Sequence, residues 1–372
     1  MIRNYMGIIN LEEQENDIRS LTANRPIATI PIGGRFRVID FMLSNMINAG
    51  ITHISVFCDK PTRSMADHLG SGKPWDLDRK EEGLFTFSNS ILGNVSNSSA
   101  KNFGLNMEFF NKAKAENVIL CSSYMIANMD LDYLAEQHEK SGADISIVYK
   151  PVENAETRYL NCDLIKFDQN SKVLNISQNI GIEQRANVCT EIFFMKKKML
   201  IELMYKAISN GVKSAFKEVI YNNILSYDVK AIPFNGYLAC INSIETFYNT
   251  NMSMLELETT GELFSRINPI YTKTKDSPPA MFTKTGDVSH SIVSDGSVIS
   301  GNVKDSVIFR NVKVEEGAVL EGCIVLPNAV IGKNAHLSNV IVDKDVNVDE
   351  GVHVECPKQY PLVFEKKSYS GQ

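Results

Sequence analysis

Several features that mark common protein classes are absent from this sequence. No apolar run approaches the roughly 20 residues that a membrane-spanning helix needs. The 44 Asp and Glu residues outnumber the 38 Lys and Arg residues, so there is no basic surplus to attract nucleic acid or an anionic membrane. The start shows no basic segment followed by an apolar one, as a secretory signal would. We therefore expect a cytoplasmic protein that binds neither nucleic acid nor a membrane.

The cysteines also lack the spacing that would give them a shared role. There are seven, scattered along the chain, and no pair has the C-x-x-C spacing of a zinc or redox site. An odd number in a protein expected in the cytoplasm does not indicate a disulfide framework. The sequence predicts reduced thiols, most of them in the core.

The first two thirds of the chain have the pattern of an α/β domain. At 372 residues the chain exceeds what one hydrophobic core usually holds, so two domains are expected. Short apolar runs alternate with helical patterns such as 41–49 and 132–140, which predicts a Rossmann-like, mostly parallel sheet. A helix over 244–257 and a linker rich in proline and charge, 272–280, follow. The apolar runs are "YMGII" (5–9), "HISVF" (53–57), "NVILC" (117–121) and "DISIVY" (144–149), with further strand candidates up to residue 241.

The last part of the chain repeats about every 17 residues. Three aligned segments, 311–327, 328–344 and 345–354, place apolar residues in common columns, and an earlier, less regular coil fits 291–309. Matching columns of this kind predict a parallel β-helix of about four coils, because each coil buries its apolar column against the next. An irregular β-sandwich would not predict them. The columns are Val312, Ala329 and Val346; Val314, Ile331 and Val348; Leu320, Leu337 and Val354; and, at a turn, Gly317, Asn334 and Gly351.

These patterns divide the chain into three predicted segments. We expect residues 1–257 to form the α/β domain, 258–285 to form a linker and 286–372 to form the β-helix. The exposed side of a short β-helix is also a natural contact surface between subunits.

Two stretches carry a resemblance to a known family. "PIGGRFRVIDFMLSNMINAGI" (31–51) resembles the signature of the ADP-glucose pyrophosphorylases almost position for position, and residues 294–344 are similar to that family's left-handed β-helix. The resemblance implies transfer of adenylyl from ATP to glucose 1-phosphate, giving ADP-glucose and pyrophosphate for glycogen synthesis. Such a site needs backbone amides and cations around the phosphates, and carboxylates that hold magnesium.

The family's phosphate-binding loop falls on residues 10–18, where this chain departs from it. The glycine pair is replaced by Glu12 and Glu13, the third glycine by Glu15 and the arginine by Asp17. Two like charges at ~4 Å repel by about 1 kcal/mol in water and by more in a partly buried site. We expect a solvated acidic turn that no longer binds phosphate.

At three further positions this chain lacks the charged side chain that the family resemblance leads us to expect. Ile27 stands where the resemblance places a phosphate-binding lysine, and it offers neither charge nor donor. Ser123 and Cys240 stand where it places the two aspartates that hold magnesium, and neither replaces a carboxylate well. Asp130 and Asp132 could in principle rescue metal binding, but their position favours capping of the next helix. We therefore predict no catalytic residue, no metal ligand and no cofactor.

A chain that lacks all these groups together resembles the non-catalytic GlgD-type subunit of Gram-positive bacteria. The resemblance implies a regulatory subunit in the cytoplasm that pairs with a catalytic ADP-glucose pyrophosphorylase subunit, as a heterotetramer. One alternative is an active sugar-1-phosphate nucleotidyltransferase with a changed substrate. Another is an acyltransferase, since β-helices often belong to such enzymes, with His336 as its one candidate residue.

The resemblance also implies an effector site for sugar phosphates or other anions. Two of its basic positions are kept, Arg25 and Arg37, and a guanidinium binds phosphate well. A structural role for Arg37, paired with Asp40, is the alternative. The family's basic cluster in the β-helix is reduced here to His336, with Lys333 and Lys344 nearby.

Overall fold

The computed structural model describes residues 4–58, 62–88, 99–210 and 216–366. Contacts between residues divide the chain into two compact units that do not follow chain order. The first unit contains most of the α/β domain, and the second contains the β-helix together with 14–38 and 241–263. The compact units join segments that are distant in the chain, so the domain limits at 257 and 285 stay predictions.

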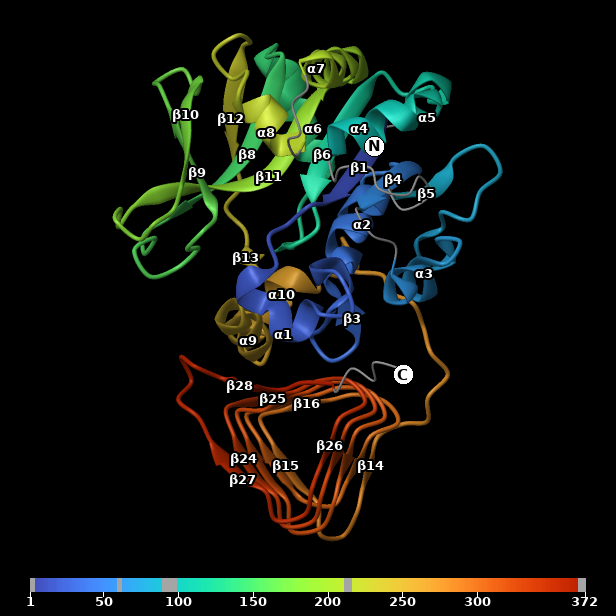
Figure 1. Ribbon diagram of the computed structural model, residues 1–372, viewed down its shortest axis with the longest axis vertical. Helices are drawn as coiled ribbons and strands as arrows, with labels where there is room; N and C mark the ends of the chain where they lie inside the picture. Colours follow the sequence, from blue (N-terminus) through green and yellow to red (C-terminus); the bar gives the residue numbers. More distant parts are fainter. Residues whose placement is uncertain (1–3, 59–61, 89–98, 211–215, 367–372) are drawn as a thin grey trace. The chain divides into compact units, whose positions relative to one another are not determined.

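The first unit is built on a mixed sheet, which within the described ranges has nine strands (Figure 1). Its order is β10-β9-β11-β6-β1-β4-β5, with β8 beside β11 and β12 beside β8. The strands from β6 to β5 run parallel, as predicted. The long strand β11 runs antiparallel to β6, β8 and β9, which the apolar runs did not indicate. The strands are β1 (Tyr5–Leu11), β4 (His53–Cys58), β5 (Gly83–Ser88), β6 (Asn117–Ser122), β8 (Ile145–Val152), β9 (Asp163–Phe167), β10 (Val173–Gln178), β11 (Ala186–Lys196) and β12 (Val229–Pro233), and a separate pair is β7 (Met125–Ile126) with β13 (Ala239–Cys240).

The helices of this unit confirm the two helical patterns predicted from sequence. The pattern at 132–140 is α6, which begins after Asp130 and ends at Ser141, before the cap residue Gly142. The Asp130 side chain accepts a hydrogen bond from the Tyr133 backbone N–H at 3.0 Å, so this residue is a helix cap, as expected. The helices are α2 (Val38–Asn48), α3 (Arg63–Leu69), α4 (Ser99–Leu105), α5 (Met107–Lys112), α6 (Leu131–Ser141), α7 (Lys197–Ser209) and α8 (Phe216–Tyr221).

The second unit contains the predicted β-helix, a left-handed parallel solenoid. Three parallel sheets, each five-stranded in the described part of the chain, form its sides. The predicted columns are confirmed, since Val314 pairs with Ile331, which in turn pairs with Val348. The strands are β14 (Met281–Phe282), β15 (Asp287–Ser289), β16 (Ile292–Val293), β17 (Val298–Ile299), β18 (Asn302–Lys304), β19 (Val307–Ile308), β20 (Lys313–Val314), β21 (Val319–Glu321), β22 (Ile324–Val325), β23 (Val330–Ile331), β24 (His336–Ser338), β25 (Val340–Val342), β26 (Asn347–Val348), β27 (His353–Glu355) and β28 (Leu362–Phe364).

The turn column of the repeat is confirmed by its backbone. Gly317, Asn334 and Gly351 have φ values of 76°, 56° and 70°, in the left-handed region. Glycine adopts this region freely, and asparagine does so at lower cost than most residues. The chemistry of the turn therefore specifies the period as much as the apolar columns do.

Three expectations for the second unit were wrong in detail. The solenoid has five strands in each described sheet rather than about four coils, and it begins at β14, inside the predicted linker. Paired residues lie 15 positions apart from β15 to β18 and from β16 to β19, and 17 apart from β18 to β21 and from β20 to β23. The shorter spacing explains why the earlier coil looks less regular when the sequence is aligned at a period of 17. The predicted helix 244–257 is two helices, α9 (Ile244–Ser253) and α10 (Leu257–Leu263).

The family signature serves the packing of the second unit. The signature begins with two short strands, β2 (Pro31–Ile32) and β3 (Phe36–Arg37). The segment before it forms η1 (Asn16–Ile18), α1 (Arg19–Thr22) and η2 (Ile27–Thr29). Gly34, at φ 81°, accepts a hydrogen bond at its carbonyl oxygen from the Ser294 hydroxyl of the solenoid, at 2.9 Å. A Cβ atom at Gly34 would lie 2.9 Å from the Ile292 side chain, so only glycine fits.

Along the described ranges, no helix is both long and apolar enough to cross a membrane.

Candidate functional site

The first group of candidate residues lies where neighbouring parallel strands of the first unit end. Glu13 follows β1 and Ser123 follows β6, and these strands are paired in parallel. Ligands of open α/β sheets bind at the carboxyl ends of the strands. Here the Glu13 carboxylate accepts hydrogen bonds from the Ser123 backbone N–H at 2.8 Å and from its hydroxyl at 2.7 Å. A side chain of the protein thus occupies donors that could otherwise bind an anion.

This contact corrects the expectation of a solvated acidic turn. Burial raises the pKa of the Glu13 carboxyl to about 7, hydrogen bonds from Ser123 lower it and the charge of Glu191 raises it further. The neighbouring acids also have partners. Glu12 accepts a hydrogen bond from the Asn10 side chain at 3.0 Å, and Glu15 accepts one from the Ile27 backbone N–H at 3.1 Å. Glu12, Glu13 and Glu15 therefore fix the loop by accepting hydrogen bonds, whereas Asp17 is exposed, as expected for a solvated turn.

A second group of hydrogen-bonded polar side chains, centred on Lys217, lies in the same unit, and no sequence pattern indicated it. The Lys217 ammonium donates to Glu191 at 2.6 Å and to Asp163 at 2.9 Å. The Tyr124 hydroxyl donates to the same oxygen of Glu191 at 2.5 Å, and the Tyr221 hydroxyl donates to Asp163 at 3.0 Å. Lys217, a cation that could have met a phosphate, is held between two carboxylates of the protein.

The ionisation of this buried group follows from its contacts. Burial by itself lowers the pKa of Lys217, but the charges of Glu191 and Asp163 outweigh it and raise the pKa above its usual value. Burial raises the pKa of Glu191, and Lys217 opposes that shift. Glu191 also has a φ of 55°, in the left-handed region that non-glycine residues adopt at a cost of about 1 kcal/mol. We infer that the ion pair holds a strained backbone in place.

The two positions that the family resemblance assigns to magnesium ligands come together but do not fit the metal. Cys240 on β13 pairs with Met125 on β7, close in sequence to Ser123. Burial raises the pKa of the Cys240 thiol well above its usual value, so the thiol stays protonated. A neutral thiol and a hydroxyl are poor ligands for a hard cation that prefers carboxylate oxygens. Nor do three or more His, Cys, Asp or Glu side chains gather as metal ligands anywhere in the described ranges.

Ile27 belongs to the second unit, where its side chain is fully buried. It begins η2, and its backbone N–H donates to the Glu15 carboxylate in the same unit. The position at which the resemblance expects a cation thus belongs to the apolar core. Ile27 therefore contributes to packing, where the resemblance predicts a lysine that binds phosphate.

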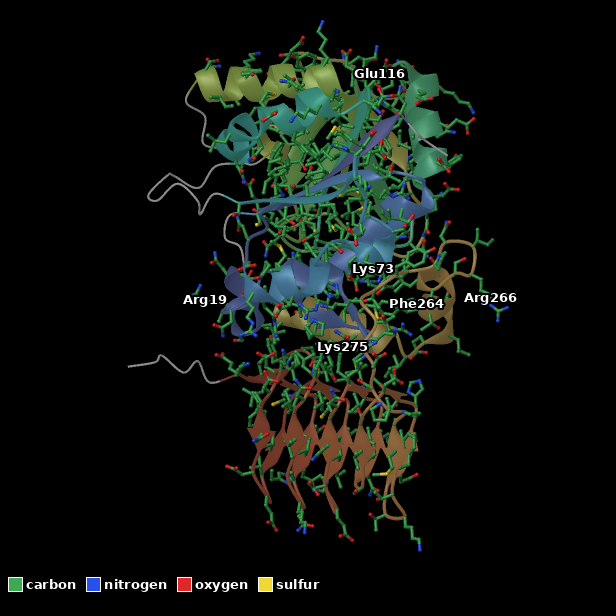
Figure 2. The ribbon with its side chains drawn as sticks, turned by 90° about the vertical axis from the view of Figure 1, so that its right-hand side faces the viewer. Arg19, Lys73, Glu116, Phe264, Arg266 and Lys275 are labelled. Atoms are coloured by element: carbon green, nitrogen blue, oxygen red, sulfur yellow. The ribbon has the colours of Figure 1, made fainter. Side chains whose placement is uncertain are left out.

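Basic side chains gather in the second unit, and we call them the basic cluster. Burial lowers the pKa of Lys275, and the positive charges of Lys344, Arg37, Arg310 and Lys273 lower it further. Figure 2 labels Lys275, which lies in the segment leading into the solenoid. Several cations this close repel one another, which is the environment that an anion relieves. The cluster consists of Arg35, Arg37, Lys273, Lys275, Arg310 and Lys344.

Arg310 is the most enclosed member of the basic cluster. It is 8% exposed, and its buried Nε has no hydrogen-bond partner among the described residues. Burial lowers the pKa of Arg310, the charge of Arg35 lowers it further and Asp295 opposes both. A buried guanidinium nitrogen without an acceptor is costly unless a ligand or water supplies one. The sequence reading missed Arg310, because "FRN" inside a β-helix repeat gives no signal of its own.

The two arginines predicted for an effector site have different surroundings. Arg37 contributes to the basic cluster. Arg25 donates to Asp343 of the solenoid at 2.5 Å, with both side chains almost fully buried. His336 is exposed on β24, where its ring lies 5.2 Å from that of His353 on the next coil. Asp40, the suggested partner of Arg37, contacts the buried His68 at 2.5 Å.

Comparison with known proteins agrees with this architecture. A model of the nucleotidyl transferase family matches residues 17–225, and a model described as GlmU-like, C-terminal hexapeptide matches residues 278–359. A protein of Geobacillus stearothermophilus called glycogen biosynthesis protein GlgD is 30% identical over 323 residues, covering 86% of this chain and 84% of the relative. The chain belongs to the ADP-glucose pyrophosphorylase family.

Relatives of both kinds within the ADP-glucose pyrophosphorylase family are similar over nearly the whole chain. The glycogen biosynthesis protein GlgD of Bacillus subtilis is 29% identical over 375 residues, covering 100% of this chain and 99% of the relative. A glucose-1-phosphate adenylyltransferase of Bacillus mycoides is 27% identical over 349 residues, covering 92% of each. These relatives support a role in glycogen biosynthesis.

Proposed function

We propose that this chain is a non-catalytic regulatory subunit of ADP-glucose pyrophosphorylase. It would act in the cytoplasm by changing the activity of a catalytic partner subunit and its response to effectors. The observation that carries the proposal is the contact between Glu13 and Ser123. It places a carboxylate at the strand ends where a member of this family would hold the phosphates of its nucleotide.

The energetics of that contact oppose substrate binding. A triphosphate at these strand ends would have to displace the Glu13 carboxylate from two good hydrogen bonds or share the space with it. Lys217 offers little compensation, because it already contacts Glu191 and Asp163. Extracting one member of a buried charged group costs about 3–5 kcal/mol. The closed state of the site is therefore the stable one without any partner.

The first alternative is an active nucleotidyltransferase with a changed substrate. It would need carboxylates in place of Ser123 and Cys240 and glycines in place of the acidic residues before Ile18, and the sequence has neither. The acyltransferase alternative depended on His336, which is exposed beside a second histidine on the solenoid. No observation favours either alternative over the regulatory subunit.

The basic cluster supports an anionic effector for this subunit. Arg310 and Lys275 are enclosed cations whose pKa values are lowered by burial and by neighbouring positive charge. A phosphate group would accept hydrogen bonds from them and reduce their mutual repulsion. We propose that a phosphorylated sugar or a similar anion binds here, with Arg37 in the cluster and Arg25 holding the segment in place through Asp343.

The test is ADP-glucose synthesis by this chain, by the catalytic subunit of the same organism and by the two mixed. We expect no turnover by the chain alone, and a raised rate or a changed response to sugar phosphates in the mixture. The mixture should elute from gel filtration as one species larger than either chain. Turnover by the purified chain alone, or a mixture that behaves as the sum of its parts, would refute the proposal.

A further inference from the structure

The first unit contains a cavity far from the closed site. It has a volume of about 560 Å³ and lies where β1, β4 and β5 begin, with Tyr5, His53 and Glu82 among its lining residues. The Glu13 and Ser123 contact lies at the opposite, carboxyl ends of these strands. Figure 1 shows β4, β5, α4 and α5 together at this part of the unit, and Figure 2 labels Glu116, which follows the lining residue Ala115. The volume is typical of small-molecule sites, which range from roughly 300 to 1,000 Å³.

The cavity has aromatic walls that present ring faces and edges. The rings of His53 and Phe109 are stacked, with centroids 4.5 Å apart and planes 25° apart. Phe85 lies 5.0 Å from Phe109 in an edge-to-face arrangement, and 37% of its surface is exposed. Leu105 at the end of α4 also lines the cavity and is 53% exposed. Aromatic walls of this kind favour a ligand with a flat ring that can stack against them.

One polar atom in this wall has no partner. The Nε2 atom of His53 is buried and makes no hydrogen bond to any described residue. Burial lowers the pKa of His53, Glu82 raises it and Lys197 lowers it, so the imidazole is neutral near pH 7. A neutral ring nitrogen can accept a hydrogen bond from a ligand N–H. Leaving it without a partner carries a cost that such a ligand would remove.

The rim of the cavity carries more negative than positive charge. Glu81 contacts Lys114 at 3.3 Å and Glu108 contacts Lys112 at 2.6 Å, so these four residues balance. Glu82 accepts a hydrogen bond from the uncharged Thr52, and among the described residues no cation is in contact with it. The residual negative charge beside the aromatic wall favours a cation and disfavours a phosphate or a carboxylate.

We propose that this cavity is a second ligand site, which binds a small planar heteroaromatic amine. The ligand ring packs against the exposed side of Phe85, because the Phe85 and His53 rings lie 5.5 Å apart and admit no ring between them. A ring N–H donates to Nε2 of His53, and the ammonium group faces Glu82. Such a ligand differs in charge from the substrates and effectors proposed for the rest of the chain. The inference does not depend on the regulatory role, since it concerns the opposite edge of the sheet.

Calorimetric titration of the full chain with two indoles that differ in charge tests this site. Tryptamine supplies the ring N–H and a cation, whereas indole-3-acetate supplies the same ring with an anion. We expect saturable binding of tryptamine below millimolar concentration, and binding of indole-3-acetate that is about tenfold weaker or undetectable. No saturable binding of tryptamine, or equal binding of both compounds, would overturn the proposal.

Matched variants locate the binding. Leu105→Glu and Leu105→Arg place long side chains of opposite charge at the same exposed position. We expect tryptamine, a cation, to bind more tightly to Leu105→Glu and more weakly to Leu105→Arg. His53→Phe keeps the stacked ring and removes Nε2, and should weaken binding roughly fivefold. Tyr133→Ala, at an exposed aromatic on α6, is the control. If binding is the same in the two Leu105 variants, or falls as much in Tyr133→Ala, tryptamine binds elsewhere and the proposal is wrong.

Discussion

The Glu13 carboxylate accepts two hydrogen bonds from Ser123, at 2.8 Å from its backbone nitrogen and 2.7 Å from its hydroxyl oxygen. The two residues are far apart in sequence, and they follow two strands that are paired in parallel. Each stands at a position where the family resemblance expects a group that serves the nucleotide or its metal. In this chain they bind each other instead. The two hydrogen bonds stabilise the Glu13 carboxylate in a loop where several acidic side chains would otherwise repel one another.

The raised pKa of Glu13 makes stability depend on pH. Its carboxyl titrates near 7 in the folded protein and near 4.5 when unfolded, so the folded state binds the proton more tightly. The free energy of unfolding therefore falls by at most about 3 kcal/mol as pH rises from about 4.5 to about 7. At higher pH, Glu13 causes no further change. Glu13→Gln keeps the acceptor oxygen but cannot ionise. We expect it to gain about 2 kcal/mol over the wild type between pH 5.5 and pH 8.

Urea unfolding at the two pH values measures this difference. Glu258→Gln, at an exposed position on α10, is the matched control and should track the wild type at both. If Glu13→Gln and the wild type show the same pH dependence, the buried carboxyl is not responsible for it.

Restoring one metal position should not restore catalysis. Ser123→Asp introduces a carboxylate beside Glu13, where like charges repel and the two donated hydrogen bonds are partly lost. We expect no ADP-glucose synthesis and a loss of stability of about 1–3 kcal/mol. The measurement is turnover with ATP, glucose 1-phosphate and magnesium, together with urea unfolding.

A double variant, Ser123→Asp with Glu13→Gly, separates repulsion from the remaining losses. It should regain stability but stay inactive, because Ile27 and Cys240 still lack the required groups. Turnover by either variant would show that closure of the site rests on a single contact.

Lys217 should be essential to the fold although it is a charged residue. Lys217→Met leaves Glu191 and Asp163 buried without their cation, and removing one partner of a buried ion pair costs about 3–5 kcal/mol. Lys140→Met is the control, because its pair with Glu136 is exposed and should be worth under about 1 kcal/mol. Denaturant unfolding of the two variants compares them, and a similar small loss in both would mean that the buried group is not ionised as described.

Arg310 should link anion binding to the stability of the second unit. At low ionic strength, inorganic phosphate should raise the unfolding temperature of the wild type, because binding to the folded state alone is stabilising. Arg310→Met removes an enclosed cation that repels Arg35, so the variant should be more stable without phosphate and gain less from it. Thermal unfolding with and without 10 mM phosphate measures both effects.

Lys313→Met tests whether the effect belongs to the cluster. Lys313 is exposed on β20 of the same solenoid and should respond to phosphate as the wild type does. An undiminished response in Arg310→Met would place the anion outside the basic cluster, and no response in the wild type would remove the effector proposal.

The sequence by itself determined the repeating part of this protein and its family. A β-helix coil contacts the next coil through residues one period away, so apolar columns and left-handed turns such as Asn334 are visible as a pattern. The signature at 31–51 was equally readable, because Gly34 meets a requirement for space that no other residue satisfies. The prediction that Ile27, Ser123 and Cys240 replace catalytic groups also came from the sequence, since it depends only on the residue type at each position.

Only the tertiary structure shows which contacts the residues at and around these positions make. Partners such as Glu13 with Ser123, Lys217 with Asp163 and Arg25 with Asp343 are separated by long stretches of chain, and no local pattern pairs them. For the same reason the acidic loop was mistaken for a solvated turn: an acid accepting backbone hydrogen bonds and one facing water have the same letter in the sequence. Burial and the donors within reach decide between the two, and both are set by the packing of distant segments.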